Sequence, residues 1–440
     1  MVVQDLPRDE TRVGAKRDQE GTAINAQITI PLDLPDVRVL TVEMNPRGDC
    51  TIAVESTIEG TKCRKCGREI RDFHGVDEWI TLRHLPILGR RVYLGIRPKR
   101  YRCPYCEEGP TTTQELSWYE AKSPPTKAYE KYLLLQLVHA TIADVSIKEE
   151  MGDKALEGIV NRWISTEVKW AEVKKVKVLG LDEIALKKGH RDFVVIVTGR
   201  LATGEVRVLA VLPDRKKQTV RQFLEAMPKR VKRAIRTVCT DLYEGFITAV
   251  KEVLGKAEVV VDRFHVAKLY RECADRLRKK ELPRLKRELP PQEYASLKGA
   301  LWAFRKNQAD LEAPEQDLLK RVFAYAPELE QAYAYREQLT AIFEEALSKE
   351  EATKKLQDWQ QQVRASGLRC YERFLKTLDT WREEITNYVL NRHNSGFVEG
   401  LNNKIKVLKR RCYGIFNLPH LFQRLFLDLE GYRVFANPVS

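Results

Sequence analysis

Val176-Lys-Val-Leu-Gly-Leu-Asp182 is a short run rich in Val and Leu that ends on an acid, and it predicts the first strand of a sheet. Two similar runs follow at residues 193–198 and 206–211, and the Thr and Gly residues between them predict an antiparallel meander. Four elements come next: a helix at 218–230, a strand at 235–240, a helix at 246–254 and a strand at 258–262. This order, β-β-β-α-β-α-β, indicates an α/β domain.

Two aspartates close strands of this predicted sheet. Asp182 ends the first strand and Asp241 ends the fourth, so in a sheet where these strands are neighbours both carboxylates emerge at one edge. Taken alone, an aspartate at a strand end is more commonly a turn former or a helix cap. To hold two divalent cations, the two aspartates would need a third acid beside them.

Glu399 is the candidate for that third acid. Its segment, residues 394–410, carries apolar residues at helical spacing: Phe397, Leu401, Ile405 and Leu408. At about 100° per residue Glu399 falls on the opposite face, although a glutamate there can also be merely solvated. Three carboxylates suit Mg²⁺ or Mn²⁺ and not zinc. Two such ions can support in-line phosphoryl transfer.

Two Cys-x-x-Cys pairs lie upstream, Cys63-Arg-Lys-Cys66 and Cys103-Pro-Tyr-Cys106. This spacing lets each pair supply two thiolates to one tetrahedral Zn²⁺, which would be structural because protein fills all four positions. Since 36 residues separate the pairs, we expect an extended hairpin, with strands near 79–82 and 92–96, to bring them together. Unrelated free thiols and a redox dithiol are the alternatives.

The chain is strongly basic, with 76 Lys and Arg against 62 Asp and Glu in 440 residues and a formal net charge of +14. Between Thr61 and Cys106, 12 Lys and Arg face 4 Asp and Glu. Cations interleaved with tyrosines contact phosphates and stack on sugars or bases, so we expect double-stranded DNA as the partner, a solvated basic face being the alternative. The candidate contacts in this module are Arg97, Lys99, Arg100 and Arg102.

The composition, 43% hydrophobic and 31% charged, is globular. No run approaches the length of a membrane span, and the first residues lack a signal pattern, so we expect a cytoplasmic protein with no membrane partner. Helical spacing predicts two or three short helices at 129–170. After Arg263 the chain is charged and helical to about Leu390, and we expect three tryptophans as its buried anchors: Trp302, Trp359 and Trp381.

The order of these motifs resembles the DDE transposases of bacterial insertion sequences, most closely the ISL-three family. The matching motifs are Cys63-x-x-Cys66-Gly67, Arg97-Pro-Lys-Arg-Tyr-Arg-Cys-Pro-Tyr-Cys106, Gly180-Leu-Asp-Glu183, Thr240-Asp-Leu-Tyr243, Val261-Asp-Arg-Phe-His265, Glu399-Gly-Leu-Asn-Asn-Lys-Ile-Lys406 and Lys409-Arg-Arg-Cys-Tyr-Gly414. The resemblance covers about residues 50–430, and the motifs follow the family's order. Tyr243 stands where relatives usually have Trp, a conservative aromatic change.

The resemblance implies an RNase H-like catalytic core interrupted by a long all-helical insertion, preceded by a zinc-ribbon-like module and a helix-turn-helix-like helical segment. It places Asp182, Asp241 and Glu399 in the positions of the acids that bind two Mg²⁺ (or Mn²⁺) ions. Asp262 and His265 could support the metal site or contact DNA, or they could be a helix cap and a core histidine.

The domain boundaries that we expect follow the motifs. They are a lead-in at 1–45, a zinc-binding DNA-contact module at 46–115, a helical DNA-binding segment at 116–172, the first part of the core at 173–263, the helical insertion at 264–393, and the last core helix with the C-terminal tail at 394–440.

The implied function is to bind terminal inverted repeats and to cleave and transfer DNA strands. Four basic residues after Glu399 would hold phosphates near the metal ions: Lys404, Lys406, Lys409 and Arg410. Because two element ends must be processed together, we expect a homodimer or a larger synaptic complex. A non-catalytic DNA-binding protein derived from a transposase, and a nuclease that cuts without joining, are the alternative functions.

Overall fold

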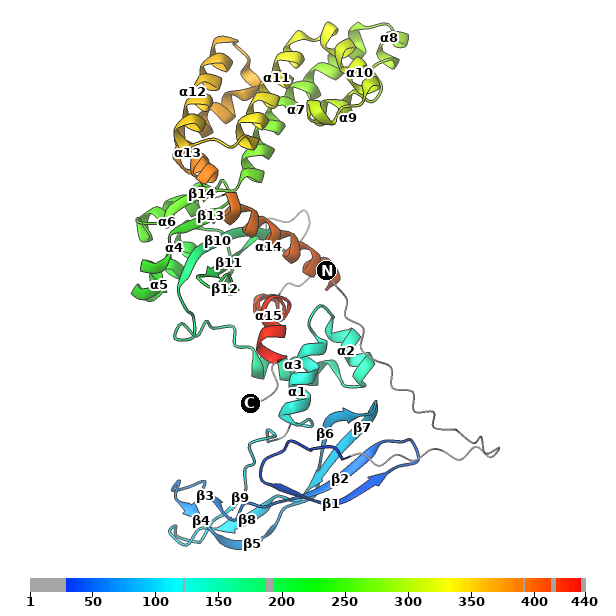
Figure 1. Cartoon of the computed structure of the whole chain (residues 1–440), viewed down its shortest axis with the longest axis vertical. Helices are drawn as coiled ribbons and strands as arrows, with labels where there is room; N and C mark the ends of the chain where they lie inside the picture. The colour runs from blue at the N-terminus through cyan, green and yellow to red at the C-terminus, as the bar shows by residue number, and fades with distance from the viewer. Residues whose placement is uncertain (1–28, 122, 187–192, 391, 413–416, 437–440) are drawn as a thin grey trace, which may run out of the picture. The chain divides into compact units, whose positions relative to one another are not determined.

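Figure 1 shows the computed structural model of the chain, which describes residues 29–121, 123–186, 193–390, 392–412 and 417–436, without the side chains of 393–399 and 402. The chain divides into two compact units, one ending at Ala128 and the other beginning at Tyr129. Within the described ranges, no helix is both long enough and apolar enough to cross a membrane.

The first unit is built from strands. They are β1 (Val37–Met44), β2 (Cys50–Ser56), β3 (Thr61–Lys62), β4 (Glu69–Ile70), β5 (Asp72–Val76), β6 (Ile80–Ile87), β7 (Arg90–Ile96), β8 (Lys99–Arg102) and β9 (Thr111–Thr113). β1-β2-β7-β6 form one sheet, β5-β8-β9 a second and β3-β4 a third. Alternate residues of β2 are buried, so Ile52 and Val54 pack with Leu94 of β7 in a core of this unit.

The hairpin predicted between the two cysteine pairs is confirmed, but two sheets share it. β6 and β7 pair antiparallel, and β7 also pairs with β2, so this outer part belongs to the four-stranded sheet. β5 pairs antiparallel with β8, with Asp72 opposite Arg102. Because Cys103 directly follows β8, and β5 follows Cys63 and Cys66 in the chain, the pairing of β5 with β8 brings the second cysteine pair back toward the first.

The second unit opens with the short helices that the spacing predicted, α1 (Lys127–Gln136, which begins just before the unit boundary), α2 (Ile142–Glu149) and α3 (Asp153–Trp163). Thr141 begins α2 with a capping box, because its hydroxyl accepts from the Asp144 N–H and the Asp144 carboxylate accepts from the Thr141 N–H. These helices share a buried core with α15 (Leu418–Phe435), and Gln423 of α15 donates to Asn161 at 2.8 Å.

The predicted order β-β-β-α-β-α-β is confirmed, with the first helix region divided in two. Its elements are β10 (Val176–Ala185), β11 (Phe193–Leu201), β12 (Val206–Leu212), α4 (Lys217–Ala226), α5 (Lys229–Ala234), β13 (Thr237–Thr240), α6 (Glu244–Val253) and β14 (Glu258–Val261). The sheet order is β12-β11-β10-β13-β14. β10, β13 and β14 run parallel, whereas β10, β11 and β12 form the expected antiparallel meander.

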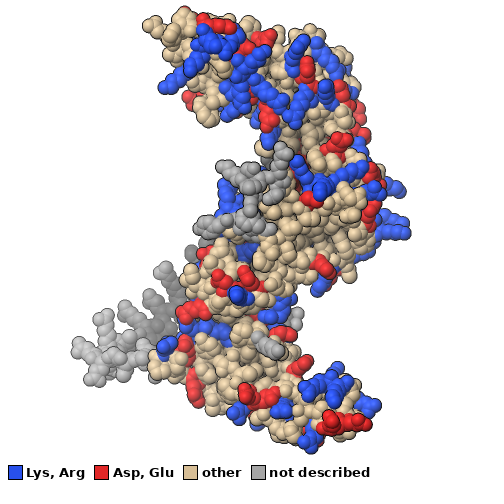
Figure 2. All heavy atoms as spheres, turned by 180° about the vertical axis from the view of Figure 1, so that it is seen from behind, with Lys and Arg blue, Asp and Glu red and all other residues tan. Residues whose placement is uncertain are grey.

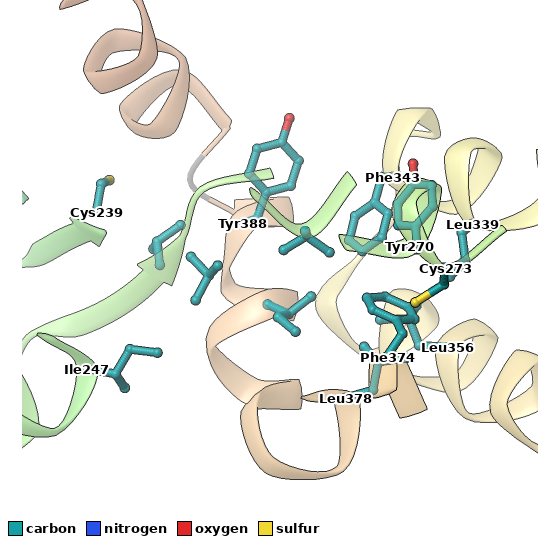
Figure 3. Close-up of a cluster of buried hydrophobic side chains, with 14 of the residues drawn as sticks. Cys239, Ile247, Tyr270, Cys273, Leu339, Phe343, Leu356, Phe374, Leu378 and Tyr388 are labelled. Atoms are coloured by element: carbon teal, nitrogen blue, oxygen red, sulfur yellow. The ribbon is translucent and has the colours of Figure 1, made fainter. Parts of the chain in front are cut away.

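A long helical segment follows β14 and rises from that edge of the sheet in Figure 1. It comprises α7 (Arg263–Glu288), α8 (Pro291–Ala295), α9 (Ala300–Arg305), α10 (Ala313–Tyr325), α11 (Pro327–Glu344), α12 (Lys349–Ala365) and α13 (Glu372–Leu390), with 3-10 turns at Gln308–Asp310 and Arg369–Tyr371. Ile247 beside the sheet belongs to the same buried cluster as Tyr270 and Phe374 in the helices (Figure 3). Asn387 of α13 also donates to the Val259 carbonyl of β14 at 2.9 Å. The helical segment is thus packed onto the β14 edge.

The three tryptophans expected as buried anchors of this segment behave differently. Trp359 is 2% exposed and donates to the Tyr335 carbonyl, as predicted. Trp381 is half-buried where α13 kinks. Trp302 is 66% exposed, so that prediction was wrong. The packed face of α9 is made by Ala300, Ala303 and Phe304, and residue 302 falls outside that face at helical spacing.

Candidate functional site

β10 and β13 are parallel neighbours, and their register places Leu181 opposite Thr240. Asp182 and Asp241 each come one residue later, so the two carboxylates lie side by side, as the strand order predicted. Asp241 directly follows β13, but Asp182 does not end its strand as predicted, because β10 continues to Ala185 through its pairing with β11. One ligand atom from each aspartate and one from His265 all lie within 4.8 Å of one another. We call these three residues the acidic cluster.

Both aspartates of the acidic cluster are largely buried. Burial, followed by the charge of Asp241, raises the pKa of Asp182 to about 8, against the opposing effects of His265 and Lys406. Two carboxylates held this close repel each other, and a divalent cation bound between them would relieve that repulsion. Their oxygen donors fit Mg²⁺ or Mn²⁺.

His265 enters the cluster from α7, which begins directly after β14. Its Nε2 lies 3.0 Å from Oδ1 of Asp241. Burial lowers the pKa of His265, but the hydrogen bond with Asp241 and the nearby carboxylates outweigh that effect, so the net pKa is raised. His265 is therefore not an inert core histidine, and it can orient the Asp241 carboxylate.

Asp262 has a different task. Its carboxylate caps α7 by accepting a hydrogen bond from the Phe264 N–H at 3.0 Å. Of the alternatives for the pattern Val261-Asp-Arg-Phe-His265, the helix cap fits Asp262 and support of the acidic cluster fits His265.

α14 (Arg392–Arg411) is the helix predicted at 394–410, and it lies against β10 and β13. Leu401, Ile405 and Leu408 are buried, as the spacing predicted. The side chains of Glu399 and Phe397 lie outside the described residues, as do Tyr413 and Gly414 of the last motif. The role of Glu399 stays a prediction, which the position of its helix beside the two aspartate-bearing strands favours.

Two of the four candidate cations of α14 are hydrogen-bonded to backbone carbonyls of other elements. Lys404 donates to the Asp428 carbonyl at 2.7 Å, and Lys409 donates to the Ala185 carbonyl. Lys406 and Arg410 are exposed. Lys406 is close enough to act on the charge of Asp182, so it is the α14 cation best placed to meet a phosphate beside the acidic cluster.

The four cysteines of the two pairs meet in the first unit. Their sulfurs lie within 4.8 Å of one another, with 3.9 Å between Cys63 and Cys106 and 3.7 Å between Cys66 and Cys103. Thiolates about 2.3 Å from a tetrahedral zinc would be about 3.8 Å apart, so the cluster fits that ion. A hydrogen bond from the Cys66 backbone is the main cause that lowers the pKa of Cys63 to about 6, whereas burial and the neighbouring thiols raise the pKa of Cys106 to about 12. Cys63 is therefore the thiol that favours the thiolate before a metal binds.

The four candidate DNA contacts of the first unit lie along the inner hairpin. Arg97 and Arg102 are exposed. Arg100 donates to Thr111 at 2.8 Å and lies 3.5 Å from Asp77, and Lys99 lies 4.0 Å from Glu55. The structure thus leaves Arg97 and Arg102 the more available for a phosphate.

Arg215 is a site residue that the sequence did not reveal. Its Nη1 donates to Glu183 at 2.9 Å, and its guanidinium lies over the rings of Phe193 and Tyr243 at 4.6 and 5.3 Å. Glu183 follows Asp182 in β10, and Tyr243 lies two residues after Asp241. Arg215 therefore joins the two segments that carry the catalytic candidates. No local motif marks it, because its partners come from three separate segments.

Comparison with known proteins gives two family matches. Residues 179–425, more than half of the chain, match the family model of the ISL3 DDE domain, described as a transposase. Residues 59–106 match the zinc-finger of the transposases of IS204, IS1001, IS1096 and IS1165. These ranges include the acidic cluster and the four cysteines, respectively.

Individual relatives agree. The chain is 26% identical over 392 residues to the transposase for insertion sequence element IS1001 of Bordetella parapertussis, covering 88% of this chain and 93% of the relative. It is 24% identical over 398 residues to the transposase for IS1557 of Mycobacterium tuberculosis, covering 84% and 86%. Among solved structures, the Drosophila P element transposase strand transfer complex matches with 12% identity and a TM-score of 0.28, over 70% of this chain and 78% of that one. At that TM-score no common arrangement of elements is established.

Proposed function

Because the chain belongs to the ISL3 family of DDE transposases, we propose that it is an active transposase with an RNase H-like core. It binds the terminal inverted repeats of its insertion sequence, cleaves the DNA there and joins the released end to target DNA in the bacterial cytoplasm. The observation that carries this proposal is the meeting of Asp182, Asp241 and His265 within 4.8 Å on the neighbouring parallel strands β10 and β13 and the first turn of α7.

Asp182, Asp241 and Glu399 are the residues that would hold two Mg²⁺ (or Mn²⁺) ions. When bound, such ions make an attacking oxygen more nucleophilic and stabilise the leaving oxygen during in-line phosphoryl transfer. A water serves as the nucleophile that cleaves the element end, and the 3′-hydroxyl released there serves as the nucleophile in strand transfer. No covalent intermediate with the protein is needed, so no serine or tyrosine nucleophile is assigned.

The remaining site residues orient the acids and the substrate. His265 fixes the Asp241 carboxylate through its hydrogen bond, and Arg215 ties together the segments after Asp182 and Asp241. Lys406 places a cation beside Asp182, where it would hold a phosphate of the cleaved strand. Arg410, also exposed on α14, is a further cation for this role, and Lys404 and Lys409 hold the helix in place through the Asp428 and Ala185 carbonyls.

The zinc module and the helices α1–α3, which precede the core sheet in the chain, would recognise the DNA. Structural Zn²⁺ held by Cys63, Cys66, Cys103 and Cys106 would present Arg97 and Arg102, while Lys99 and Arg100 support the hairpin. The α1–α3 helices would add the helix-turn-helix-like contact. Since two element ends must be joined, the working form would be a homodimer or larger. Sedimentation with end DNA should therefore show complexes with two or more chains, and complexes of one chain alone would contradict this assembly.

The test is incubation of purified protein and Mg²⁺ with DNA that contains the element ends and their flanks. The wild type should give discrete cuts at the ends and joined products. Asp182→Asn, Asp241→Asn and Glu399→Gln should each abolish both products while leaving end binding nearly intact, because the lost charge serves the metals. Full cleavage by one variant would remove that residue from the triad. Binding without any wild-type cleavage would favour the non-catalytic alternative, and cuts without joining would favour the nuclease.

A further inference from the structure

α7 is an unusually basic helix that begins inside the acidic cluster. Its sequence from Arg263 to Glu288 carries ten Lys and Arg against four Asp and Glu, a net charge of +6. His265, in its first turn, lies 3.0 Å from Asp241. Figure 2 shows that Lys and Arg gather densely over the helical segment to which α7 belongs. A cationic surface therefore starts at the point where DNA would be cleaved.

One face of α7 is packed and the opposite face is open. Val266, Tyr270, Cys273 and Leu277 are buried in the shared core (Figure 3 labels Tyr270 and Cys273). At about 100° per residue the opposite face carries Lys268, Lys279 and Lys286, with Arg271 at its side and Glu272 among them, and all five are exposed. Lys279 lies 3.3 Å from Asp275, and the four cations outnumber the one exposed acid. We call these four cations the α7 track. From Lys268 to Lys286 it is about 27 Å long at about 1.5 Å per residue, the length of about eight phosphates of one strand spaced 3.4 Å apart.

The first two residues of the α7 track are available to a ligand. Among the described residues no acidic side chain lies within ion-pairing distance of Lys268 or Arg271, and Arg271 bonds only the neutral Asn307 at 3.2 Å. Lys268 lines two adjoining hollows of about 330 Å³ each, one that includes His265 and Arg373 and one that includes Arg271 and Arg305. Glu272 lines both hollows, Glu244 the first and Asp275 the second, and Asp275 is neutralised by its ion pairs with Arg278 and Arg305. The surface next to the acidic cluster is therefore hollowed as well as basic.

The order of the sheet indicates which part of the substrate this track would meet. α15 shares a buried core with α1–α3, and it packs against β12 at one edge of the sheet. α7 leaves from β14 at the other edge, and the acidic cluster lies between them, on β10 and just after β13. DNA recognised beside the β12 edge and cleaved at β10 and β13 continues, beyond the cleavage point, toward the β14 edge. That continuation is the DNA outside the element.

We propose that the α7 track binds the backbone of the DNA that flanks the element, immediately beyond the cleavage point. This inference rests on the proposed transposase function. It assigns the flank to α7 and the element end to the zinc module and α1–α3, so the enzyme holds both sides of the bond that it cuts. Lys268 is the nearest contact to that bond, and Lys279 and Lys286 lie progressively further along the flank.

The test compares two duplex probes without Mg²⁺, one that stops at the cleavage point and one that continues into the flank. The variant Lys268→Gln/Arg271→Gln should bind the short probe like the wild type. On the long probe, the negative slope of log K against log salt should become shallower by about 1.8. Each phosphate contact on duplex DNA contributes about 0.9 to the steepness of that slope, and the variant loses two contacts. Lys279→Gln/Lys286→Gln should affect only probes whose flank is long enough to reach these residues.

The matched control is Lys229→Gln/Lys256→Gln. Both lysines are exposed. Lys229 comes before β13 and Lys256 before β14, so they belong to the segments that enter these strands, whereas Asp241 follows the other end of β13. This control should leave both slopes unchanged. An equal loss on both probes would assign α7 to the element end, and no loss on either probe would exclude the track as a DNA surface; both results overturn the proposal. Because binding is measured without metal, absence of wild-type cleavage would overturn the proposed function separately.

Discussion

The imidazole Nε2 of His265 lies 3.0 Å from Oδ1 of Asp241, and this contact joins the first turn of α7 to the end of β13. The two residues are separated in the chain by α6 and β14. The parallel pairing of β13 with β14 makes the contact possible, because it brings the ends of both strands to the same edge of the sheet. The orientation of one catalytic candidate thus depends on how the helical segment begins.

Replacing His265 with Asn should reduce Mg²⁺-dependent cleavage about 10- to 100-fold, the usual effect of removing a group that orients a metal ligand. The measurement is the cleavage rate as a function of Mg²⁺ concentration, and the Mg²⁺ needed for half-maximal rate should rise. The control is Ser348→Ala, which removes the side-chain cap of α12 and should cost about 1 kcal/mol of stability without the same change in Mg²⁺ dependence. Identical Mg²⁺ curves for wild type and His265→Asn would contradict the orienting role.

Asp182→Asn should stabilise the metal-free protein while it abolishes cleavage. Burial and the charge of Asp241 raise the pKa of Asp182 to about 8, which means that the folded state disfavours the charged carboxylate. A neutral amide of similar shape removes that repulsion, and an effect of about 1 kcal/mol would raise the melting temperature of this unit, residues 129–440, by about 1.5 °C. Calorimetry with chelator at a pH above 8, where the wild-type carboxylate is charged, checks it. A lower melting temperature would show that Asp182 serves mainly as a structural acceptor.

Arg215→Gln should slow cleavage about tenfold, because the segments after Asp182 and Asp241 lose their common anchor at Glu183 and Tyr243. Arg215→Lys should restore little, since an ammonium does not stack on Phe193 and Tyr243 as a planar guanidinium does. Single-turnover rates at saturating Mg²⁺ provide the measurement. Arg221→Gln, which breaks an exposed ion pair with Glu225 on α4, is the control and should leave the rate unchanged.

Cys103→Ser should release zinc and unfold the zinc module while the second unit stays folded, because each unit has its own buried core. Metal analysis should find one zinc per chain in the wild type and much less in the variant. Limited proteolysis should then cut before Ala128 and spare residues 129–440. Cys50→Ala removes a buried cysteine outside the cluster and should retain the zinc. Full zinc content in Cys103→Ser would remove this residue from the ligand set.

Local patterns in the sequence were enough to predict several parts of this protein. The strand order, the helix at 394–410 and the hairpin between the cysteine pairs follow from spacing and turn residues, and all are confirmed. The meeting of Asp182 and Asp241 was predicted on the condition that the first and fourth strands are neighbours, which the parallel pairing of β10 and β13 satisfies. These features depend on periodicity along the chain, which the sequence displays directly.

Other features could not be read from periodicity. The same pattern fitted a cap or a ligand for Asp262 and His265, and only the pairing of β13 with β14 assigned the cap to one and the Asp241 contact to the other. Trp302 looked like an anchor by residue type, yet its helix packs through Ala300, Ala303 and Phe304.

The sequence by itself therefore determined the elements, the candidate acids and the four thiolates, because each rests on short-range spacing. The tertiary structure alone decided that Arg215 bridges two segments, that the outer hairpin joins another sheet, and that the basic face of α7 starts at the acidic cluster. The physical reason is that these relationships depend on which distant strands pair and on which helix face is buried. Both are settled by packing free energy over the whole unit and not by any local run of residues.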